Sequence, residues 1–170
     1  MKLLLQRVNQ ASVTVDNEVI GEIQCGLLVL AGFGVQDHPA LPETDMWSAL
    51  IRKMLDLRIF PDGQGKMNLG LRDYGGELLL VPQFTLYADC RKGKRPSFTD
   101  AAPPDVAQKL FDRLVCDAQA LLQKKVSTGR FGAEMYVQLT NWGPVTIELC
   151  GNASGGQNSH ARQQLHPDRR

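Results

Sequence analysis

Three short segments of this 170-residue chain carry residue types that could bind or transform a substrate. The first is Gln83-Phe84-Thr85, in which an amide and a hydroxyl stand two residues apart. On a strand these two side chains would share one face, with Phe84 on the other. Such a pair can position a substrate. A half-exposed strand with a polar outer face accounts for the same pattern, so both interpretations stay open at this point.

The second segment is Gly143-Pro144, which lies between two alternating apolar runs, residues 135–139 and 145–149. Proline cannot donate to a strand ladder, and the glycine before it has unusual backbone freedom. One interpretation is a tight connection between two strands. The other is a rigid backbone step that presents its carbonyl groups to a ligand. The residue types alone allow both.

The third segment is the basic cluster Arg91, Lys92, Lys94 and Arg95, which is broken by glycine and followed by Phe98. Four cations and a nearby aromatic ring suit phosphate contacts and stacking on a base. A solvated charged loop is the simpler alternative. The formal net charge is only +1, so any role in nucleic-acid binding must depend on this local patch.

The sequence lacks the residues that several kinds of catalysis require. No histidine lies beside the three segments, so a Ser-His-Asp or Cys-His arrangement has no base. No carboxylate pair or metal-ligand spacing occurs, and we expect no metal and no cofactor. Residues 63–68 lack the Gly-Lys-Ser/Thr ending of a phosphate-binding P-loop and indicate a hairpin turn instead.

Cys90 leaves one alternative open, because it adjoins Arg91 and Lys92 and neighbouring cations can activate a thiol. A thiol-dependent hydrolase would still lack its histidine partner.

The bulk composition, 43% apolar and 22% charged, is that of an ordinary globular protein. No stretch is apolar enough to span a membrane, so we expect a cytoplasmic protein without a membrane partner.

The elements that would position these segments are mostly strands, interrupted by two helices. Because several strands follow one another without a crossover helix, the pattern predicts an α+β fold with a largely antiparallel, barrel-like sheet. We expect one domain over residues 1–150 and a disordered tail over 151–170, where apolar periodicity stops. Strands are expected at residues 3–8, 12–15, 19–23, 27–31, 58–60, 77–87, 135–139 and 145–149, helices at 43–55 and 103–124, and a loop at 90–100.

Eight short motifs occur in order along the chain, each weak alone but specific as a set. They are Gln6-Arg7-Val8, Ala11-Ser12-Val13-Thr14-Val15, Gly26-Leu27-Leu28-Val29-Leu30, Leu57-Arg58-Ile59-Phe60, Gly65-Lys66-Met67-Asn68-Leu69, Gln83-Phe84-Thr85-Leu86-Tyr87-Ala88-Asp89, Arg95-Pro96-Ser97-Phe98 and Gly143-Pro144-Val145-Thr146. From residue 1 to about residue 149 this set closely resembles the D-aminoacyl-tRNA deacylases.

The resemblance implies the fold of that family and a homodimer whose active sites lie at the subunit interface. Gly143-Pro144 would be cis and would reach into the pocket of the partner, where its carbonyl oxygens hold the α-amino group of the amino acid. An L side chain would then collide with rigid backbone. Glycine has no side chain to collide, so mischarged glycyl-tRNA is an expected substrate as well. Arg7 resembles the family's residue that braces this Gly-Pro loop.

The resemblance also implies roles for the other segments. Gln83, Phe84 and Thr85 are the expected catalytic residues, Met67 and Phe98 are expected to bind substrate beside Arg7, Gly143 and Pro144, and Arg91, Lys92, Lys94 and Arg95 are expected to bind tRNA. Backbone N–H groups around Phe84 and Thr85 would stabilise the oxyanion, and a terminal ribose hydroxyl of the tRNA would assist.

Two positions depart from the family pattern. Pro82 stands where the family usually has Ser, and Trp142 stands where it usually has Asp. Since proline lacks the hydroxyl and the backbone donor of serine, a non-catalytic tRNA-binding module of the same fold remains the alternative function.

Overall fold

The computed structural model describes residues 1–151, and one long strand organises it. Strand β1 pairs antiparallel with three others, β3 and β2 along one edge and β8 along the other. This sharing is possible because β1 is 14 residues long. The bounds of these strands are β1 Lys2–Val15, β2 Glu18–Ile23, β3 Gly26–Gly32 and β8 Tyr136–Cys150.

The sheet continues beyond β3 through two parallel pairings, to β6 (Glu77–Pro82) and then β7 (Ser127–Thr128). At the far side β7 approaches β2, where the Ser127 hydroxyl donates to the carbonyl of Glu22 over 2.8 Å. The sheet is therefore nearly closed on itself. The predicted α+β class with a mainly antiparallel, barrel-like sheet is confirmed.

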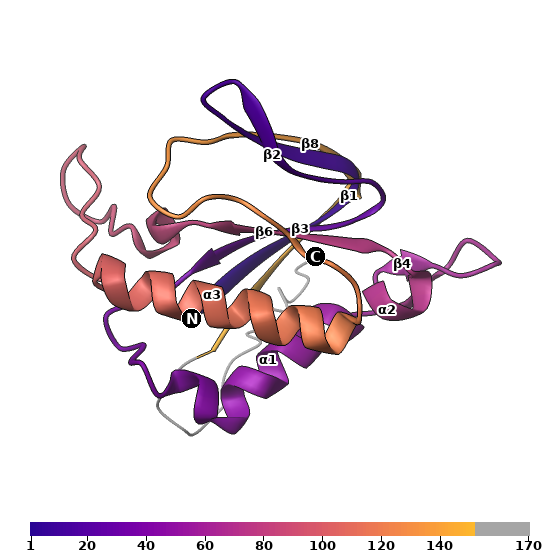
Figure 1. Cartoon of the computed structure of the whole chain (residues 1–170), viewed down its shortest axis with the longest axis horizontal. Helices are drawn as coiled ribbons and strands as arrows, with labels where there is room; N and C mark the ends of the chain where they lie inside the picture. The colour runs from indigo at the N-terminus through magenta and orange to yellow at the C-terminus, as the bar shows by residue number, and fades with distance from the viewer. Residues whose placement is uncertain (152–170) are drawn as a thin grey trace, which may run out of the picture.

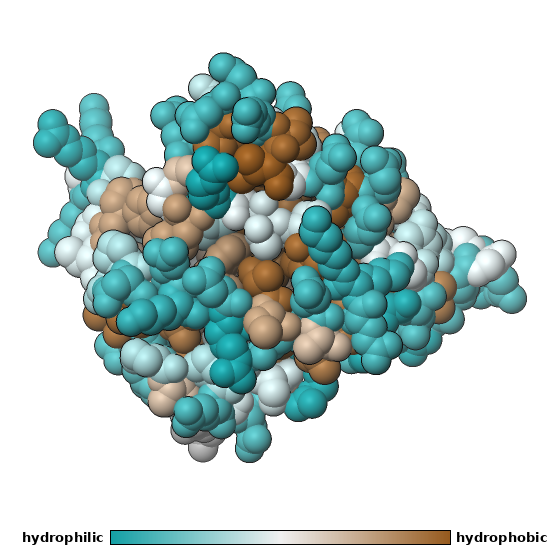
Figure 2. Space-filling view, in the orientation of Figure 1, coloured by the Kyte–Doolittle hydropathy of each residue, from teal (hydrophilic) through white to brown (hydrophobic). Residues whose placement is uncertain are grey.

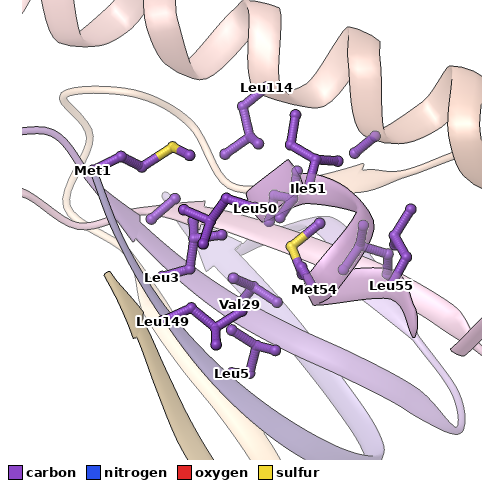
Figure 3. Close-up of a cluster of buried hydrophobic side chains, with 14 of the residues drawn as sticks. Met1, Leu3, Leu5, Val29, Leu50, Ile51, Met54, Leu55, Leu114 and Leu149 are labelled. Atoms are coloured by element: carbon purple, nitrogen blue, oxygen red, sulfur yellow. The ribbon is translucent and has the colours of Figure 1, made fainter. Parts of the chain in front are cut away.

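Two amphipathic helices cover one face of this sheet, α1 (Asp45–Asp56) and α3 (Pro104–Leu122). In Figure 1 they lie together below the sheet, while β2, β8 and the distal part of β1 form the upper part of the molecule. Figure 3 shows how Leu50, Ile51 and Met54 of α1 meet side chains of the strands, with Leu114 reaching in from α3. Both predicted helices are confirmed, and each begins and ends within two residues of the predicted position.

The opposite sheet face buries a second, smaller cluster inside the curved sheet. Neighbouring residues of β3, Leu27 and Leu28, point into different clusters, as do Leu78 and Leu79 of β6. Both strands are thus covered on both faces, which explains their continuous apolar sequences. The cluster comprises Val8, Ala11, Val13, Ile23, Leu28, Leu79 and Val81.

Five short elements complete the described part of the chain. They are the hairpin of β4 (Phe60–Pro61) and β5 (Met67–Leu69), the helix α2 (Leu71–Tyr74), and two 3-10 turns, η1 (Leu41–Glu43) and η2 (Phe84–Tyr87). The helix α2 and both 3-10 turns were absent from the sequence prediction. The turn between β4 and β5 bears out the hairpin expected at residues 63–68.

The strand predicted for residues 77–87 is wrong beyond Pro82. Strand β6 ends there and the chain turns into η2, so Gln83 and Thr85 are not two residues of one strand face. The turn packs directly over the end of β3, where a β-carbon on Gly32 would lie 2.7 Å from the carbonyl oxygen of Gln83. Because Gly32 has no side chain, the chain can turn across the sheet end instead of extending the ladder.

The two strands expected around Gly143-Pro144 are one strand, so the interpretation as a tight connection between two strands is wrong. Both halves of β8 pair antiparallel with β1, Thr146 opposite Gln6 and Asn141 opposite Val8. Four residues of β8 therefore stand opposite a single residue of β1, Arg7. Gly143-Pro144 lies in this bulge.

The two ends of the described chain meet, because Met1 and Gly151 exchange backbone hydrogen bonds of 2.9 Å each way. The predicted disordered tail lies outside the described residues from position 152 onward, and the domain boundary at residue 150 stays a prediction. Within residues 1–151, no helix is long and apolar enough to cross a membrane.

Candidate functional site

The first part of the candidate site is the turn that follows β6. The N–H of Gln83 donates to the Ala31 carbonyl over 2.7 Å, which anchors the turn to the end of β3. The side-chain amide of Gln83 donates to the Thr85 hydroxyl, so two of the predicted catalytic residues are in direct contact. Phe84 projects from the same turn with 54% of its surface exposed.

Two backbone donors at the start of η2 are unused. The first N–H groups of a helical turn have no acceptor within it. Among residues 1–151, no backbone or side-chain acceptor is bonded to the N–H of Phe84 or of Thr85. Both groups are therefore available to an oxygen atom of a bound molecule.

A mainly apolar cleft of about 810 Å³ opens beside this turn. Gln83 and Phe84 form one wall, Phe98 and the start of α3 form a second, and the loop before β8 forms the third. The rings of Phe84 and Phe98 meet edge to face with centroids 5.0 Å apart. Figure 2 shows the apolar surface between the start of α3 and the chain segments above it. The cleft can hold a flat, partly apolar group such as a base or an aromatic side chain.

The second part of the candidate site is the bulge of β8. The Gly143-Pro144 peptide is cis, as the family resemblance implies, and both residues are exposed. Gly143 has φ of 137°, and a β-carbon there would lie 2.7 Å from a methyl group of Val145 and 2.8 Å from the guanidinium of Arg7. No residue but glycine fits this position without a shift of its neighbours.

The side chain of Asn141 closes the bulge. Its Oδ1 accepts from the N–H of Val145 over 2.9 Å, and its Nδ2 donates to the Val145 carbonyl over 3.3 Å and to the Thr146 hydroxyl over 3.1 Å. One amide thus satisfies both backbone groups of Val145, which the bulge removes from the ladder with β1. The sequence analysis assigned no role to Asn141. The asparagine before a Gly-Pro step was the available signal, because Asn side chains commonly bond to backbone nearby.

Arg7 supports the bulge from the side of β1 and is only 7% exposed. Its Nε donates to the Trp142 carbonyl over 2.8 Å, and a terminal nitrogen donates to the Ile59 carbonyl. Burial lowers the pKa of the guanidinium, and the charge interaction with Tyr74 opposes that shift. Arg7 therefore occupies the bracing position that the resemblance implies, held by two carbonyl oxygens.

The two parts of the site lie far apart within one chain. The register places Pro82 beside Ala31, and Ala31 opposite Leu3, so the Gln83 turn lies near the start of β1. The bulge lies opposite Arg7. From Lys2 to Arg7 a strand advances about 16 Å, and three strand-to-strand steps add to this distance. A small substrate cannot contact both parts of the same chain.

The two other predicted substrate-binding residues, Phe98 and Met67, lie at different parts of the site. Phe98 lines the cleft with Phe84. Met67 lies on β5 and is 61% exposed; it pairs with Pro61, which follows Phe60 and the Ile59 whose carbonyl accepts from Arg7. The structure thus separates the predicted substrate-binding residues into two groups.

The basic cluster forms the tip of a loop that projects from the body of the molecule before α3 (Figure 1), and Phe98 at the end of this loop lines the cleft. Backbone hydrogen bonds between Asp89 and Ser97, of 2.8 and 2.9 Å, close the base of this loop. The Arg91 side chain bonds to the Asp89 carboxylate and lowers its pKa to about 2. Lys92, Lys94 and Arg95 are exposed and form no ion pair within residues 1–151. Three positive charges therefore remain available near the cleft.

No group of three or more potential metal ligands is present among the described residues. The site consists instead of amide, hydroxyl, backbone and aromatic groups. Such groups bind by shape and hydrogen bonding, and they catalyse by positioning and by stabilising developing charge.

Comparison with known proteins decides the family. The family model described as D-Tyr-tRNA(Tyr) deacylase matches residues 4–150. The chain belongs to this family. A D-aminoacyl-tRNA deacylase of Nitratidesulfovibrio vulgaris (strain DP4) is 57% identical over 149 residues, which cover 88% of this chain and 92% of that protein. A D-aminoacyl-tRNA deacylase of Thermosipho africanus is 50% identical, covering 88% of this chain and 96% of that protein.

Two solved structures share the fold. One, titled c-Myc DNA Unwinding Element Binding Protein, has a TM-score of 0.81 and 37% identity, and the match covers 90% of this chain and all of that one. The other, described as a probable eukaryotic D-amino acid tRNA deacylase, has a TM-score of 0.73 at 20% identity, covering 87% and 97%. The family resemblance and the predicted enzyme class, a D-aminoacyl-tRNA deacylase, are confirmed.

We predict that Asn141→Ala destabilises the protein by roughly 1–3 kcal/mol, because it leaves buried or half-buried backbone groups of the bulge without partners. Urea denaturation followed by circular dichroism measures this change. The matched control is Gln138→Ala, an exposed amide on the same strand. Equal stability of the two variants would contradict the assigned role of Asn141.

Proposed function

We propose that this protein hydrolyses the ester of D-aminoacyl-tRNA and rejects L-aminoacyl-tRNA by means of the Gly143-Pro144 bulge. The observation that carries the proposal is a backbone bulge that is exposed at its tip and fixed at its base. The tip offers carbonyl oxygens to a ligand, and Arg7 and Asn141 hold the base through side-chain hydrogen bonds. The membership of the chain in the deacylase family supports the choice of substrate.

The active site is completed by a second copy of the chain. In one chain the bulge and the Gln83 turn are too far apart to meet on one substrate, as the strand register shows. In a homodimer the exposed bulge of one subunit can enter the cleft of the other. Two equivalent sites then follow from the two-fold symmetry of the interface.

The backbone of the bulge selects the D form of the amino acid by direct contact. Two carbonyl oxygens of the bulge accept from the α-ammonium group, and this fixes the direction of the other substituents on the α-carbon. A D side chain then points away, whereas an L side chain collides with the bulge. Rejecting the L form a thousandfold requires roughly 4 kcal/mol, which a steric clash with well-supported backbone can supply. Glycyl-tRNA escapes this selection, since glycine has no side chain, and is proposed as a second substrate.

Hydrolysis proceeds without a protein nucleophile. Water attacks the ester carbonyl, the developing oxyanion accepts from the unused N–H groups of Phe84 and Thr85, and Gln83 helps to place the ester. The C–O bond to the terminal ribose then breaks, and the ribose oxygen takes up the proton that the attacking water gives up. A neighbouring ribose hydroxyl assists this transfer, because no histidine or carboxylate contacts Thr85 among the described residues.

The charged loop binds the tRNA. Lys92, Lys94 and Arg95 project beside the cleft and can contact backbone phosphates, while the cleft receives the aminoacylated 3′ end. Aminoacylated tRNA is a cytoplasmic substrate, so we propose a cytoplasmic location for the activity.

The proposal predicts selective loss of D-tyrosyl-tRNA when the purified protein is incubated separately with D-tyrosyl-tRNA and L-tyrosyl-tRNA. Release of the amino acid from acid-precipitable tRNA measures the reaction. Equal loss of both substrates would contradict the chirality mechanism. Salt-sensitive binding of tRNA without turnover, even at high protein concentration, would favour a non-catalytic tRNA-binding module.

We also predict that Thr85→Ala retains activity within about a hundredfold of wild type, less than the loss expected for a group that makes or breaks a bond. Gln83→Ala serves as the comparison, because it removes the other member of the same hydrogen bond. Single-turnover deacylation of D-tyrosyl-tRNA measures both variants. Complete inactivity of a correctly folded Thr85→Ala variant would assign Thr85 a chemical role.

A further inference from the structure

One aromatic side chain of the bulge, Trp142, covers the Arg7 guanidinium, and two further rings pack against Trp142. The guanidinium carbon lies 4.3 Å from the centroid of the Trp142 ring. Trp142 in turn packs against Phe60 and Tyr74, with centroids 6.4 and 6.1 Å away, and these two rings stack on each other at 4.7 Å. The orientation of Trp142 is thus fixed by two neighbouring rings.

This aromatic cluster takes the place of an acidic partner. Among residues 1–151 no carboxylate forms an ion pair with Arg7, although its side chain is largely buried. Its hydrogen bonds go to the carbonyl groups of Ile59 and Trp142. The negative face of an aromatic ring attracts a cation, and the attraction strengthens when water is excluded. The face of the Trp142 ring therefore stabilises the buried charge of Arg7.

We propose that Trp142 is a specificity-determining positioning residue, whose ring holds Arg7 against Gly143 and thereby keeps the bulge rigid. Trp142 holds Arg7 twice, through its carbonyl and through its ring. The guanidinium lies only 2.8 Å from the place that a β-carbon of Gly143 would occupy. If the ring is lost, the guanidinium keeps its hydrogen bonds to the two backbone carbonyls but loses the contact on its face. It can then tilt away from Gly143, which leaves space into which the bulge can relax. This inference rests on the proposed function, because it concerns the rejection of the L form.

The test compares three substitutions at this position. Trp142→Phe keeps an aromatic face, Trp142→Leu keeps bulk without that face, and Trp142→Ala removes both. We expect the ratio of kcat/KM for D-tyrosyl-tRNA over L-tyrosyl-tRNA to fall about tenfold or more in the Leu and Ala variants and to stay within about threefold in the Phe variant. The control is Tyr136→Ala, which removes an exposed ring from the same strand outside this cluster.

The ratio of kcat/KM for the D over the L substrate distinguishes a positioning role of Trp142 from a purely structural one. A purely structural loss lowers the activity toward both substrates together and leaves the ratio unchanged, and that result would overturn the inference. If the Ala variant fails to fold, the Leu variant decides, since it fills most of the same space. If the wild-type protein itself fails to distinguish D from L, the proposed function fails first. An unchanged ratio in a selective enzyme refutes only the role of Trp142.

Discussion

The shared strand β1 is the constraint on which the arrangement of the site depends. Its first residues lie near the Gln83 turn, and Arg7, five residues later, lies opposite the bulge of β8. A strand cannot bend back within five residues, so one chain holds the two parts apart. The same register that builds the sheet is therefore the ground on which we propose that a second subunit completes the site.

Each part of the site forms where a ladder is interrupted. Pro82 is the last residue of β6 and has no N–H to donate to a ladder, and Gln83 makes the last hydrogen bond to β3. The chain then turns over Gly32 and leaves two N–H groups free. At the bulge, four residues of β8 face one residue of β1, and Asn141 and Arg7 supply the hydrogen bonds that the ladder cannot. Interrupted ladders thus provide donors at one part and acceptors at the other.

The sequence predicted the periodic parts of the fold and missed the parts that depend on tertiary contact. The helices were predictable because their apolar residues recur at helical spacing and pack on one sheet face. The alternation in Gln83-Phe84-Thr85-Leu86 suggested a strand, but β3 ends at Gly32 and offers no further partner. Of the two interpretations of Gly143-Pro144, the connection between two strands is wrong, because pairing of both halves of β8 with the same strand is a long-range property. The role of Trp142 could not be predicted from the sequence, since Arg7 and the two rings that pack on Trp142 come from separate segments of the chain.

The most direct test of the account is the activity of mixed dimers made by co-expression with two different affinity tags and purified on both. A dimer of one Gln83→Ala subunit and one Gly143→Ala subunit retains one intact composite site if each site draws on both chains. Our account predicts about half of the wild-type deacylation of D-tyrosyl-tRNA for this dimer, and almost none for a dimer of one wild-type subunit with one Gln83→Ala/Gly143→Ala subunit. The reverse pattern, an inactive first dimer and a half-active second, would show that each chain holds a complete site and would contradict the account.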